Sequence, residues 1–308
     1  MNMEKEAMEI LMLFGKGGIV NDSGGKDSSV LKRIAEKCRE KYGFEFSIQH
    51  NHTTLDAPET VYFIRRERER ERESGIEYEI NYPKMSFEQL CLKKQMLPTR
   101  IARFCCEYLK ERPDMDNGRL TRMITGVRKT ESPSRKYNQG IVTMIDAVET
   151  KEGAIDGVNF KKSPKGGLML MNNDNSENTE MIYTCFRTNK TLVNPLINWT
   201  DDDVWRYIRD EKIPYNPLYD CGWHRVGCIG CPMAQRRGRA FEFERYPKYR
   251  DRFIRIADKI VEMQKQKKGK DYNGSPTGLL YFKRWMEDDN VVGQYSFDMD
   301  GNITEDYK

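Results

Sequence analysis

A short apolar run that leads through a glycine-rich loop into an amphipathic segment constrains the fold of this chain more than any other feature. Gly17–Asn21 is apolar enough for a buried strand, and Ser28–Lys41 places apolar side chains at helical spacing. A second strand is expected at Phe44–Gln49, and a second helix from about Pro58. The order strand, loop, helix, strand is typical of α/β proteins. We therefore predict a parallel twisted sheet flanked by helices.

The rest of the chain carries further patterns of the same two kinds. The alternating charges of Arg65–Glu73 indicate a solvated helical face whose charges pair with one another. Lys161–Glu180 is rich in Gly, Asn, Asp and Ser, which predicts a long loop. Thr200 precedes three aspartates, as expected at a helix start. The strands predicted here are Ile76–Ile80, Met123–Val127 and Ile141–Val148, and the helices are Met85–Met96, Thr99–Arg112, Thr200–Lys212, Tyr246–Lys268 and Thr277–Glu287.

Length and composition limit the class of protein. With 308 residues the chain can form one large domain with an appendage, and we predict a first domain over residues 1–240 and a helical C-terminal extension over residues 241–308. No segment approaches the roughly 18 uninterrupted apolar residues that a membrane-spanning helix needs, and the first residues lack a signal-peptide pattern. We therefore expect a cytoplasmic protein without a membrane partner. The net charge of +4 fits an anionic ligand but does not by itself indicate nucleic acid.

The loop between the first strand and the first helix has the chemistry of a phosphate site. Glycines let backbone N–H groups approach an anion, and the start of the following helix adds the positive end of its dipole. Lys26 supplies a charge for the same phosphates, and Asp27 either holds Mg²⁺ or caps the helix. The pattern is neither a Walker loop nor GxGxxG. The residues expected to bind a nucleotide phosphate are Ser23, Gly24, Gly25, Lys26, Asp27 and Ser28.

Two pairs of closely spaced cysteines indicate a metal centre. Cys105 and Cys106 are adjacent, and Cys228 and Cys231 form a CxxC that Pro232 follows. Four thiolates are the number that a [4Fe–4S] cluster requires. Zinc is the second interpretation, although an adjacent pair fits the knuckles of structural zinc sites poorly, and a redox CxxC is the third. Without a metal, the four residues would be buried thiols.

Two further residues extend this site in the sequence. Lys110 lies four residues after the second cysteine of the adjacent pair, about one helical turn along. Its charge could offset a thiolate-ligated cluster or reach a nucleotide phosphate. Cys185, beside the predicted loop, is a candidate substitute ligand or redox thiol. The other three cysteines, Cys38, Cys91 and Cys221, are expected to be structural.

Five sequence blocks in order resemble the PAPS (phosphoadenylyl sulfate) reductase family, within the superfamily of N-type ATP pyrophosphatases. The resemblance runs from about residue 17 to residue 250. It implies a Rossmann-like, adenine nucleotide alpha-hydrolase fold and the binding of ATP, PAPS or APS (adenylyl sulfate). The blocks are SGGKDS at Ser23–Ser28, TTLDAPET at Thr53–Thr60, CCEYLKERP at Cys105–Pro113, GVRKTESPSR at Gly126–Arg135 and a long block at Asn194–Pro232.

The resemblance also implies roles for residues outside the loop. Asp56 would lie near the ribose or the metal of the nucleotide. Arg128 and Arg135 would meet the negative charge of the ligand, and Glu131 would orient them. Gly126 opens the block that carries both arginines and belongs to the same nucleotide site. Residues with an expected structural role only are Trp199, Trp205 and the turn Pro214–Pro217.

The last part of the sequence departs from the reductases of this family. Those enzymes attack sulfur with a cysteine in a C-terminal Glu-Cys-Gly-Leu-His motif, whereas the last cysteine here is Cys231. Relatives without that cysteine include the sulfur-transfer proteins of DNA phosphorothioation systems and phage and bacterial PAPS reductase-like proteins. We therefore expect an enzyme that cleaves ATP to AMP and pyrophosphate to activate a target for sulfur transfer, helped by Mg²⁺. The expected catalytic residues are Lys26, Asp27, Lys110 and Arg128.

Two other functions stay open at this point. One is a PAPS or APS reductase that uses another thiol, such as Cys185 or Cys221, and the other is a nucleotide-binding regulator without turnover. The expected partners are an adenine nucleotide and a sulfur donor such as a cysteine desulfurase or thioredoxin. Nucleic acid is a further candidate, although the basic segments 236–239 and 265–270 are better explained as solvated helix ends. The sulfur acceptor and the oligomeric state do not follow from the sequence.

Overall fold

The chain forms two compact units in a computed structural model, each assembled from separate segments of the sequence. Unit 1 comprises residues 1–52, 57–82 and 112–227, and unit 2 comprises residues 53–56, 83–111 and 228–308. The predicted boundary at residue 240 is not a limit of either unit, and a first domain over residues 1–240 stays a prediction. The residues that the structure describes are 3–111, 121–131, 139–145, 153–155, 158–162, 168–170, 190–287, 296–297 and 303–304.

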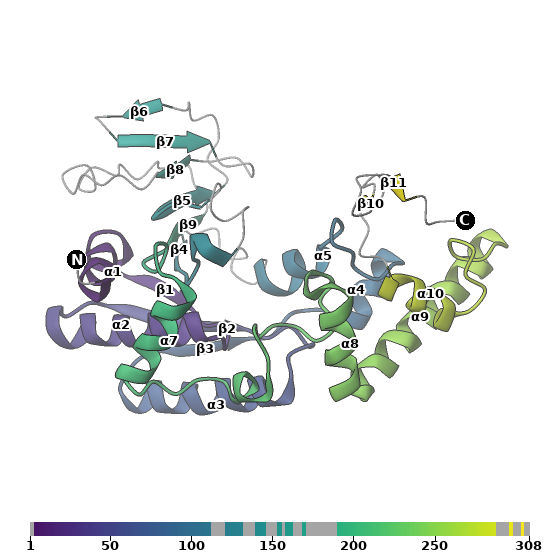
Figure 1. Cartoon of the computed structure of the whole chain (residues 1–308), viewed down its shortest axis with the longest axis horizontal. Helices are drawn as coiled ribbons and strands as arrows, with labels where there is room; N and C mark the ends of the chain where they lie inside the picture. The colour runs from purple at the N-terminus through teal and green to yellow at the C-terminus, as the bar shows by residue number, and fades with distance from the viewer. Residues whose placement is uncertain are drawn as a thin grey trace. The chain divides into compact units, whose positions relative to one another are not determined.

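Unit 1 is built around a sheet in which the five neighbouring strands from β3 to β9 are parallel (Figure 1). In the described residues the strand order is β3-β2-β1-β4-β9-β5-β8-β7-β6; neighbours from β3 to β9 are parallel, and neighbours from β9 to β6 are antiparallel. The predicted parallel sheet is confirmed, and the antiparallel extension was not expected. The strands are β1 (Gly18–Asn21), β2 (Phe46–Asn51), β3 (Tyr78–Asn81), β4 (Thr121–Ile124), β5 (Val142–Ile145), β6 (Gly153–Ile155), β7 (Val158–Lys162), β8 (Leu168–Leu170) and β9 (Lys190–Val193).

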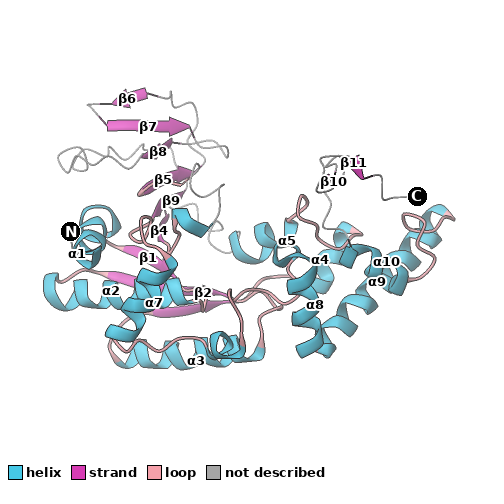
Figure 2. Ribbon diagram, in the orientation of Figure 1, coloured by secondary structure: helices cyan, strands magenta, loops and turns pink. Residues whose placement is uncertain are grey.

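The helices of unit 1 bury the apolar positions that their spacing predicts (Figure 2). In α2, Val30, Leu31 and Ile34 are fully buried in the core. The helix ends at Gly43, whose left-handed backbone lets its N–H bond to Arg39 O. The helical elements are α1 (Met3–Ile10), η1 (Leu11–Gly15), α2 (Lys26–Tyr42), α3 (Pro58–Glu73), η4 (Lys129–Glu131), α7 (Asp201–Asp210) and η6 (Pro217–Cys221).

Three expectations for unit 1 need correction. Arg65–Glu73 does form the end of α3, but Glu67 and Glu71 are each only 1% exposed, so this face is not solvated throughout. The two carboxylates can be buried because Arg70 contacts both of them. Leu168–Leu170 forms β8 inside the predicted loop Lys161–Glu180, and residues 171–180 lie outside the described part. Helix α1 was not expected.

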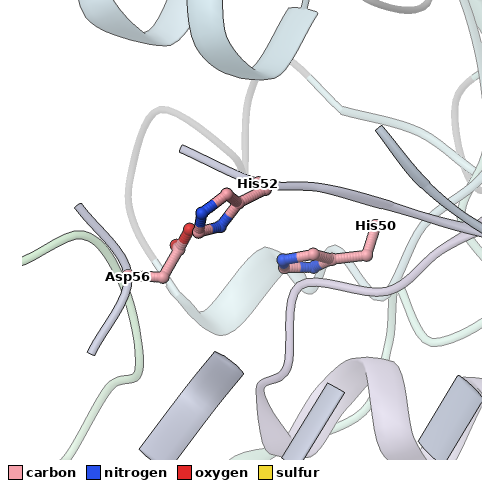
Figure 3. Close-up of side chains that lie close together, drawn as sticks. All are labelled: His50, His52 and Asp56. Carbon is pink, nitrogen blue, oxygen red and sulfur yellow. The ribbon is translucent and has the colours of Figure 1, made fainter. Parts of the chain in front are cut away.

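Polar residues gather where β2 ends. His50 is the last residue but one of β2, and His52 directly follows the strand (Figure 3). His50 Nδ1 lies 2.8 Å from Asp22 O, just beyond β1. Because β1 and β2 are parallel neighbours, their carboxyl ends meet at one edge of the sheet, which is where ligands of open α/β sheets bind.

Unit 2 is mainly helical and has an aromatic core of its own. The ring centroid of Phe253 lies 5.0 Å from that of Phe87 and 5.2 Å from those of Phe243 and Trp285. Trp285 Nε1 donates a hydrogen bond to Pro98 O at 2.7 Å. The elements are α4 (Phe87–Lys94), α5 (Phe104–Cys106), η2 (Glu107–Glu111), η7 (Pro232–Ala234), α8 (Gln235–Arg245), α9 (Pro247–Lys268), α10 (Gly278–Glu287), β10 (Ser296–Phe297) and β11 (Ile303–Thr304).

The helical predictions for unit 2 are mostly confirmed. The expected helices at Met85–Met96, Tyr246–Lys268 and Thr277–Glu287 correspond to α4, α9 and α10. The helix expected at Thr99–Arg112 begins only at Phe104, because Thr99 Oγ1 accepts the Ala102 N–H in a turn. Residues 236–239, interpreted as a solvated helix end, lie in α8, where Arg239 is only 1% exposed and so not solvated. None of the helices in the described ranges is long and apolar enough to cross a bilayer.

Candidate functional site

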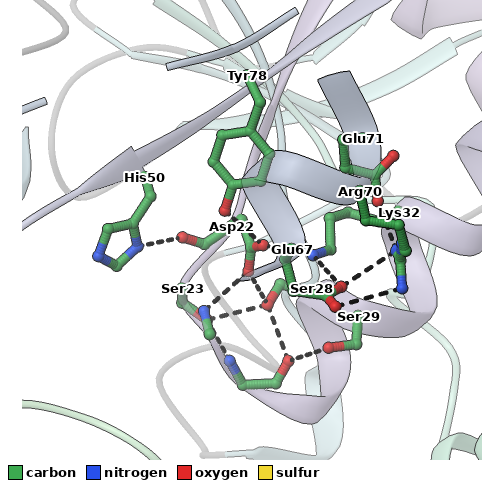
Figure 4. Close-up of polar contacts among 12 residues, drawn as sticks. Asp22, Ser23, Ser28, Ser29, Lys32, His50, Glu67, Arg70, Glu71 and Tyr78 are labelled. Carbon is green, nitrogen blue, oxygen red and sulfur yellow. Dashed lines mark hydrogen bonds and ion pairs between the residues drawn. The ribbon is translucent and has the colours of Figure 1, made fainter. Parts of the chain in front are cut away.

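Asp22 shapes the predicted phosphate loop in unit 1 (Figure 4). Its Oδ1 accepts hydrogen bonds from the Gly24 N–H at 2.8 Å and from the Ser28 hydroxyl at 2.9 Å. Gly24 has φ +73°, a region that favours glycine, and a Cβ there would lie 3.0 Å from Thr60 Cγ2. The loop is therefore held in one shape by its own contacts, and the Gly24 amide serves the loop itself.

The second oxygen of Asp22 binds a buried lysine. Asp22 Oδ2 lies 2.6 Å from Lys32 Nζ and accepts the Tyr78 hydroxyl at 2.9 Å, while Lys32 Nζ also lies 3.0 Å from Glu67 Oε2 (Figure 4). Burial by itself would raise the pKa of Asp22, but the charge and hydrogen bond of Lys32 outweigh it and lower that pKa to about 2. The loop is thus anchored to ion pairs that solvent does not reach.

Two cations and two carboxylates meet beside the loop, and we call Lys26, Asp27, Arg128 and Asp201 the four-charge cluster. Asp201 Oδ1 lies 3.0 Å from Lys26 Nζ and 2.9 Å from Arg128 Nη2. Arg128 Nε donates to Asp27 Oδ1 at 2.6 Å. The side chains of Lys26 and Arg128 are 7% and 4% exposed, whereas that of Asp201 is 57% exposed. Two nearly buried cations therefore lie beneath an exposed carboxylate.

The two carboxylates of this cluster have opposite pKa shifts. Burial raises the pKa of Asp27, although Arg128 and Lys26 act against it. Burial also acts on Asp201, but the hydrogen bond and charge of Lys26, together with Arg128, lower its pKa. Asp201 is therefore the carboxylate that both cations keep ionised.

A segment close to the end of unit 1 supports the loop from across the sequence. Asn216, fully buried, donates to Gly24 O at 3.2 Å and to Thr60 Oγ1 at 3.0 Å. The Tyr219 hydroxyl accepts the Lys26 N–H at 3.0 Å. Trp205, expected in the core, is only partly buried, and its ring centroid lies 6.0 Å from Lys26 Nζ. The predicted structural turn at Pro214–Pro217 thus contacts the loop directly.

The remaining nucleotide residues predicted in unit 1 flank this cluster. Gly126 lies against the start of α2, where a Cβ would come within 3.0 Å of Asp27 C. Glu131 Oε1 accepts the backbone N–H of Arg128 at 3.2 Å, and its expected role in orienting the guanidinium stays a prediction. Arg135 and Cys185 lie outside the described residues. Asp56 belongs to unit 2.

The sequence did not single out several residues that hold this site. Asp22 and Asp201 were not proposed as site residues. Asn216 was assigned to a structural turn, and Tyr219 was given no role. The available signal was weak: Asp22 is a polar residue directly after a buried strand, and Asp201 directly follows a helix cap. Their contacts become visible only when the chain is folded.

One pocket of unit 2 gathers the four predicted thiols. Its lining includes Cys105, Cys106, Cys228 and Cys231, from α5 and from the loop before η7. Each of the four side chains is partly exposed. The hydrogen bond with Cys106 and burial raise the pKa of Cys105, and burial raises the pKa of Cys228. The segments that carry these residues are far apart in the sequence, so the fold of unit 2 is what brings the thiols together.

Two charged residues of unit 2 lie near the thiols, Lys110 in the lining of the pocket and Asp56 beside Cys228. Lys110, in η2, also lines the pocket. The negative charge of the Cys228 and Cys106 thiolates raises the pKa of Lys110. Asp56 accepts hydrogen bonds from the Thr53 N–H at 2.7 Å and from its hydroxyl at 2.9 Å, and forms a β-bridge with Cys228. The pocket therefore brings four thiols and one ammonium group together.

Glu242 of α8 stabilises the loop that carries Cys228 and Cys231. Its Oε2 accepts the Gly230 N–H at 2.6 Å. Gly230 has φ +73°, and a Cβ there would lie 2.6 Å from Phe243 Cζ, so no other residue fits at this position. Burial raises the pKa of Glu242 to about 7, with the Gly230 amide and Arg239 acting against it. The geometry of the two cysteines thus depends on a buried carboxylate that the sequence did not reveal.

We expect Glu242→Ala to destabilise unit 2 by about 1–3 kcal/mol, because it leaves the buried Gly230 amide without an acceptor. Urea denaturation followed by tryptophan fluorescence measures this change. Glu244→Ala, on the exposed face of the same helix, is the matched control and should change the free energy of unfolding by less than about 0.5 kcal/mol. Equal effects of the two variants would show that the Gly230 hydrogen bond is unimportant.

Comparison with known proteins identifies the family. The model of the phosphoadenosine phosphosulfate reductase domain matches residues 19–234. The chain belongs to this family. The match covers more than half of the chain and contains the phosphate loop, the four-charge cluster and all four thiols of the pocket. The predicted membership of this family of enzymes is therefore confirmed.

Curated relatives match parts of the chain. The adenosine 5'-phosphosulfate reductase of Oceanobacillus iheyensis is 43% identical over 65 residues, which are 21% of this chain and 27% of that protein. The corresponding enzyme of Bacillus pumilus is 31% identical over 104 residues, or 33% and 40% of the two chains. An uncharacterised 37.8 kDa protein of Escherichia phage 186 is 28% identical over 172 residues, or 56% and 41%. The chain thus spans less than half the length of each of these relatives.

Solved structures of low sequence identity are also similar. The phosphoadenylyl-sulfate reductase of Candida auris has a TM-score of 0.43 at 18% identity, over 72% of this chain and 87% of that one. The U34-tRNA thiolase NcsA of Methanococcus maripaludis, solved with its [4Fe–4S] cluster, has a TM-score of 0.45 at 12% identity, over 98% and 84%.

Proposed function

We propose that this chain is an adenine-nucleotide-dependent sulfur-transfer enzyme that carries an iron–sulfur cluster. Unit 1 would bind ATP and cleave it to AMP and pyrophosphate, and unit 2 would hold a [4Fe–4S] cluster. The observation that carries the proposal is the pocket in which two distant segments of the chain bring four thiols and one lysine together.

The donor set of the pocket fits a [4Fe–4S] cluster. Such a cluster takes four thiolate ligands, and Cys105, Cys106, Cys228 and Cys231 would supply them. The cluster would add negative charge, which the Lys110 ammonium at the pocket is placed to offset. When bound, the cluster would supply a site at which sulfur is held and passed on. Zinc remains the alternative metal, although its structural sites usually draw on two knuckles of spaced cysteines.

The residues of unit 1 support cleavage of a nucleotide between its α and β phosphates. An acceptor oxygen would attack the α-phosphorus, the bond to the bridging oxygen would break, and pyrophosphate would leave. Lys26 and the start of α2 would stabilise the charge that develops on the leaving group. Arg128, whose guanidinium is oriented by Asp27 and Thr130, would bind phosphate oxygens with its guanidinium fork. A sulfur nucleophile would then displace AMP from the activated acceptor, and Mg²⁺ would assist the first step.

The products of the reaction test this proposal. Protein purified without oxygen and incubated with ATP, Mg²⁺ and a sulfur donor such as a cysteine desulfurase should yield AMP and pyrophosphate. The similarity to adenosine 5'-phosphosulfate reductases favours one second candidate, a reductase of PAPS or APS. Sulfite released from either compound with thioredoxin, and no pyrophosphate from ATP, would favour that candidate. Tight nucleotide binding without any product would indicate a regulator.

We expect Lys26→Ala to weaken ATP binding about 10- to 100-fold, because one charge-assisted contact with phosphate contributes roughly 1.5–3 kcal/mol. Isothermal titration calorimetry measures the change. Lys16→Ala is the control, since Lys16 is exposed and lies before β1 rather than after it. An unchanged ATP affinity of the Lys26 variant would remove the loop from the proposed site.

A further inference from the structure

We propose that Asp201 competes with anions for the phosphate site, so that a polyphosphate chain displaces it whereas a single phosphate or sulfate group gains too little to do so. Its carboxylate occupies the position that a ligand oxygen would take, because one oxygen, Oδ1, contacts both Lys26 Nζ and Arg128 Nη2. The inference rests on the proposed function in one respect only: it takes the loop of unit 1 as the place where phosphate binds.

The position of Asp201 is set by its helix rather than by the two cations. Thr200 caps α7: its hydroxyl accepts the Asp203 N–H at 3.2 Å, and Asp203 Oδ2 accepts the Thr200 N–H at 2.9 Å. This capping box uses Asp203 and leaves the Asp201 carboxylate to the cations. The backbone therefore places an anionic group beside Lys26 and Arg128 before any ligand binds.

The charges of the four-charge cluster balance: Lys26 and Arg128 are positive, and Asp27 and Asp201 are negative. Arg128 also keeps its contact with Asp27, which lies deeper than Asp201. An incoming anion must therefore displace the exposed carboxylate of Asp201, and not that of Asp27. The displaced group can turn into solvent, because more than half of its side chain is already exposed.

A small anion gains little binding free energy when it replaces the Asp201 carboxylate between the two cations. A single phosphate or sulfate group would replace one oxygen between two cations by another, and both states are charge-assisted. A pyrophosphate or triphosphate group also reaches past the cations to the start of α2, where helix amides favour negative charge. Only the longer anion therefore gains contacts that Asp201 does not already provide.

Binding of inorganic anions to the full chain tests the inference. Phosphate and pyrophosphate are titrated without Mg²⁺ into the wild-type protein, Asp201→Asn and Asp202→Asn. Asp202→Asn is the matched control. Asp202 is the next residue in the same exposed helix turn, and its replacement removes the same charge. We expect Asp201→Asn to bind phosphate and pyrophosphate each about tenfold more tightly, because both anions displace the same carboxylate, while Asp202→Asn stays within twofold of wild type for both.

The outcomes separate this inference from the proposed function. If the wild-type chain binds pyrophosphate and Asp201→Asn binds phosphate no more tightly than Asp202→Asn, the role of Asp201 is refuted and the proposed function stands. If pyrophosphate and ATP fail to bind even to the wild-type chain, both are refuted. Asp201→Ser, which also lacks the charge and suits a helix start, must shift both affinities in the same direction as Asp201→Asn. A reversed shift would overturn the inference.

Discussion

Asp22→Ala is expected to destabilise the protein by about 3–5 kcal/mol, the usual range when one partner of a buried ion pair is removed. Asp22 is 1% exposed. Its carboxylate forms an ion pair with Lys32 and accepts hydrogen bonds from the hydroxyl groups of Ser28 and Tyr78. Its loss leaves a buried ammonium group and two buried hydroxyl groups without this acceptor. The loop also loses the acceptor of its Gly24 amide, so nucleotide binding should weaken in the same variant.

Urea denaturation of unit 1 measures this effect. Asp210→Ala is the control, because Asp210 is exposed at the end of α7. Lys32→Met in the Asp22→Ala background should recover part of the lost stability, since it removes a buried charge that has lost one of its two carboxylate partners. A stability loss of less than about 1 kcal/mol for Asp22→Ala would mean that the network is not a stabilising feature.

Asp22 also makes the free energy of unfolding depend on pH. The pKa of Asp22 is about 2 in the folded chain and about 3.9 in an unfolded chain. The folded state therefore binds the proton less readily, and the contribution of Asp22 is complete above about pH 4. It is lost as the pH falls from about 4 to 2, by roughly 2–3 kcal/mol. Wild-type protein should lose most of this component between about pH 4 and pH 2, and Asp22→Ala should not.

Cys228→Ser is expected to abolish the iron–sulfur cluster. Serine keeps the size of the side chain but replaces a thiolate ligand by a hydroxyl that does not bind the cluster in its place. Iron and sulfide are counted, and the visible absorption spectrum recorded, in protein purified without oxygen. The same loss is expected for Cys105, Cys106 and Cys231, because all four line the one pocket.

Cys221→Ser is the control for the cluster, since Cys221 is an exposed cysteine of unit 1. It should keep the iron and sulfide content of the wild type. Zinc in place of iron in the wild-type protein would change the identity of the metal and leave the ligand set intact. A wild-type protein without metal, or a Cys228→Ser protein with its full iron content, would contradict the assignment of the pocket.

Local patterns anticipated most of the elements that carry the sites. The apolar run before the loop became β1, and the helical spacing after it became α2, because both patterns report burial within one element. The capping residue Thr200 was found because a cap is a contact between near neighbours. By contrast, the charge alternation in Arg65–Glu73 suggested a solvated face, and the fold buries Glu67 and Glu71 beside Lys32 and Arg70.

The sequence by itself determined the parallel α/β core, the glycine-rich loop between β1 and α2, the family and the identity of the four cysteines. Each of these depends on residues close together in the chain or on spaced blocks in order. Only the tertiary structure decided what holds them. Asp22 meets Tyr78, Lys26 meets Tyr219 and Asp201, and Gly230 meets Glu242 through contacts across folded segments. Such contacts leave no periodic signal, since one charged residue in a helix looks the same whether it faces solvent or a buried partner.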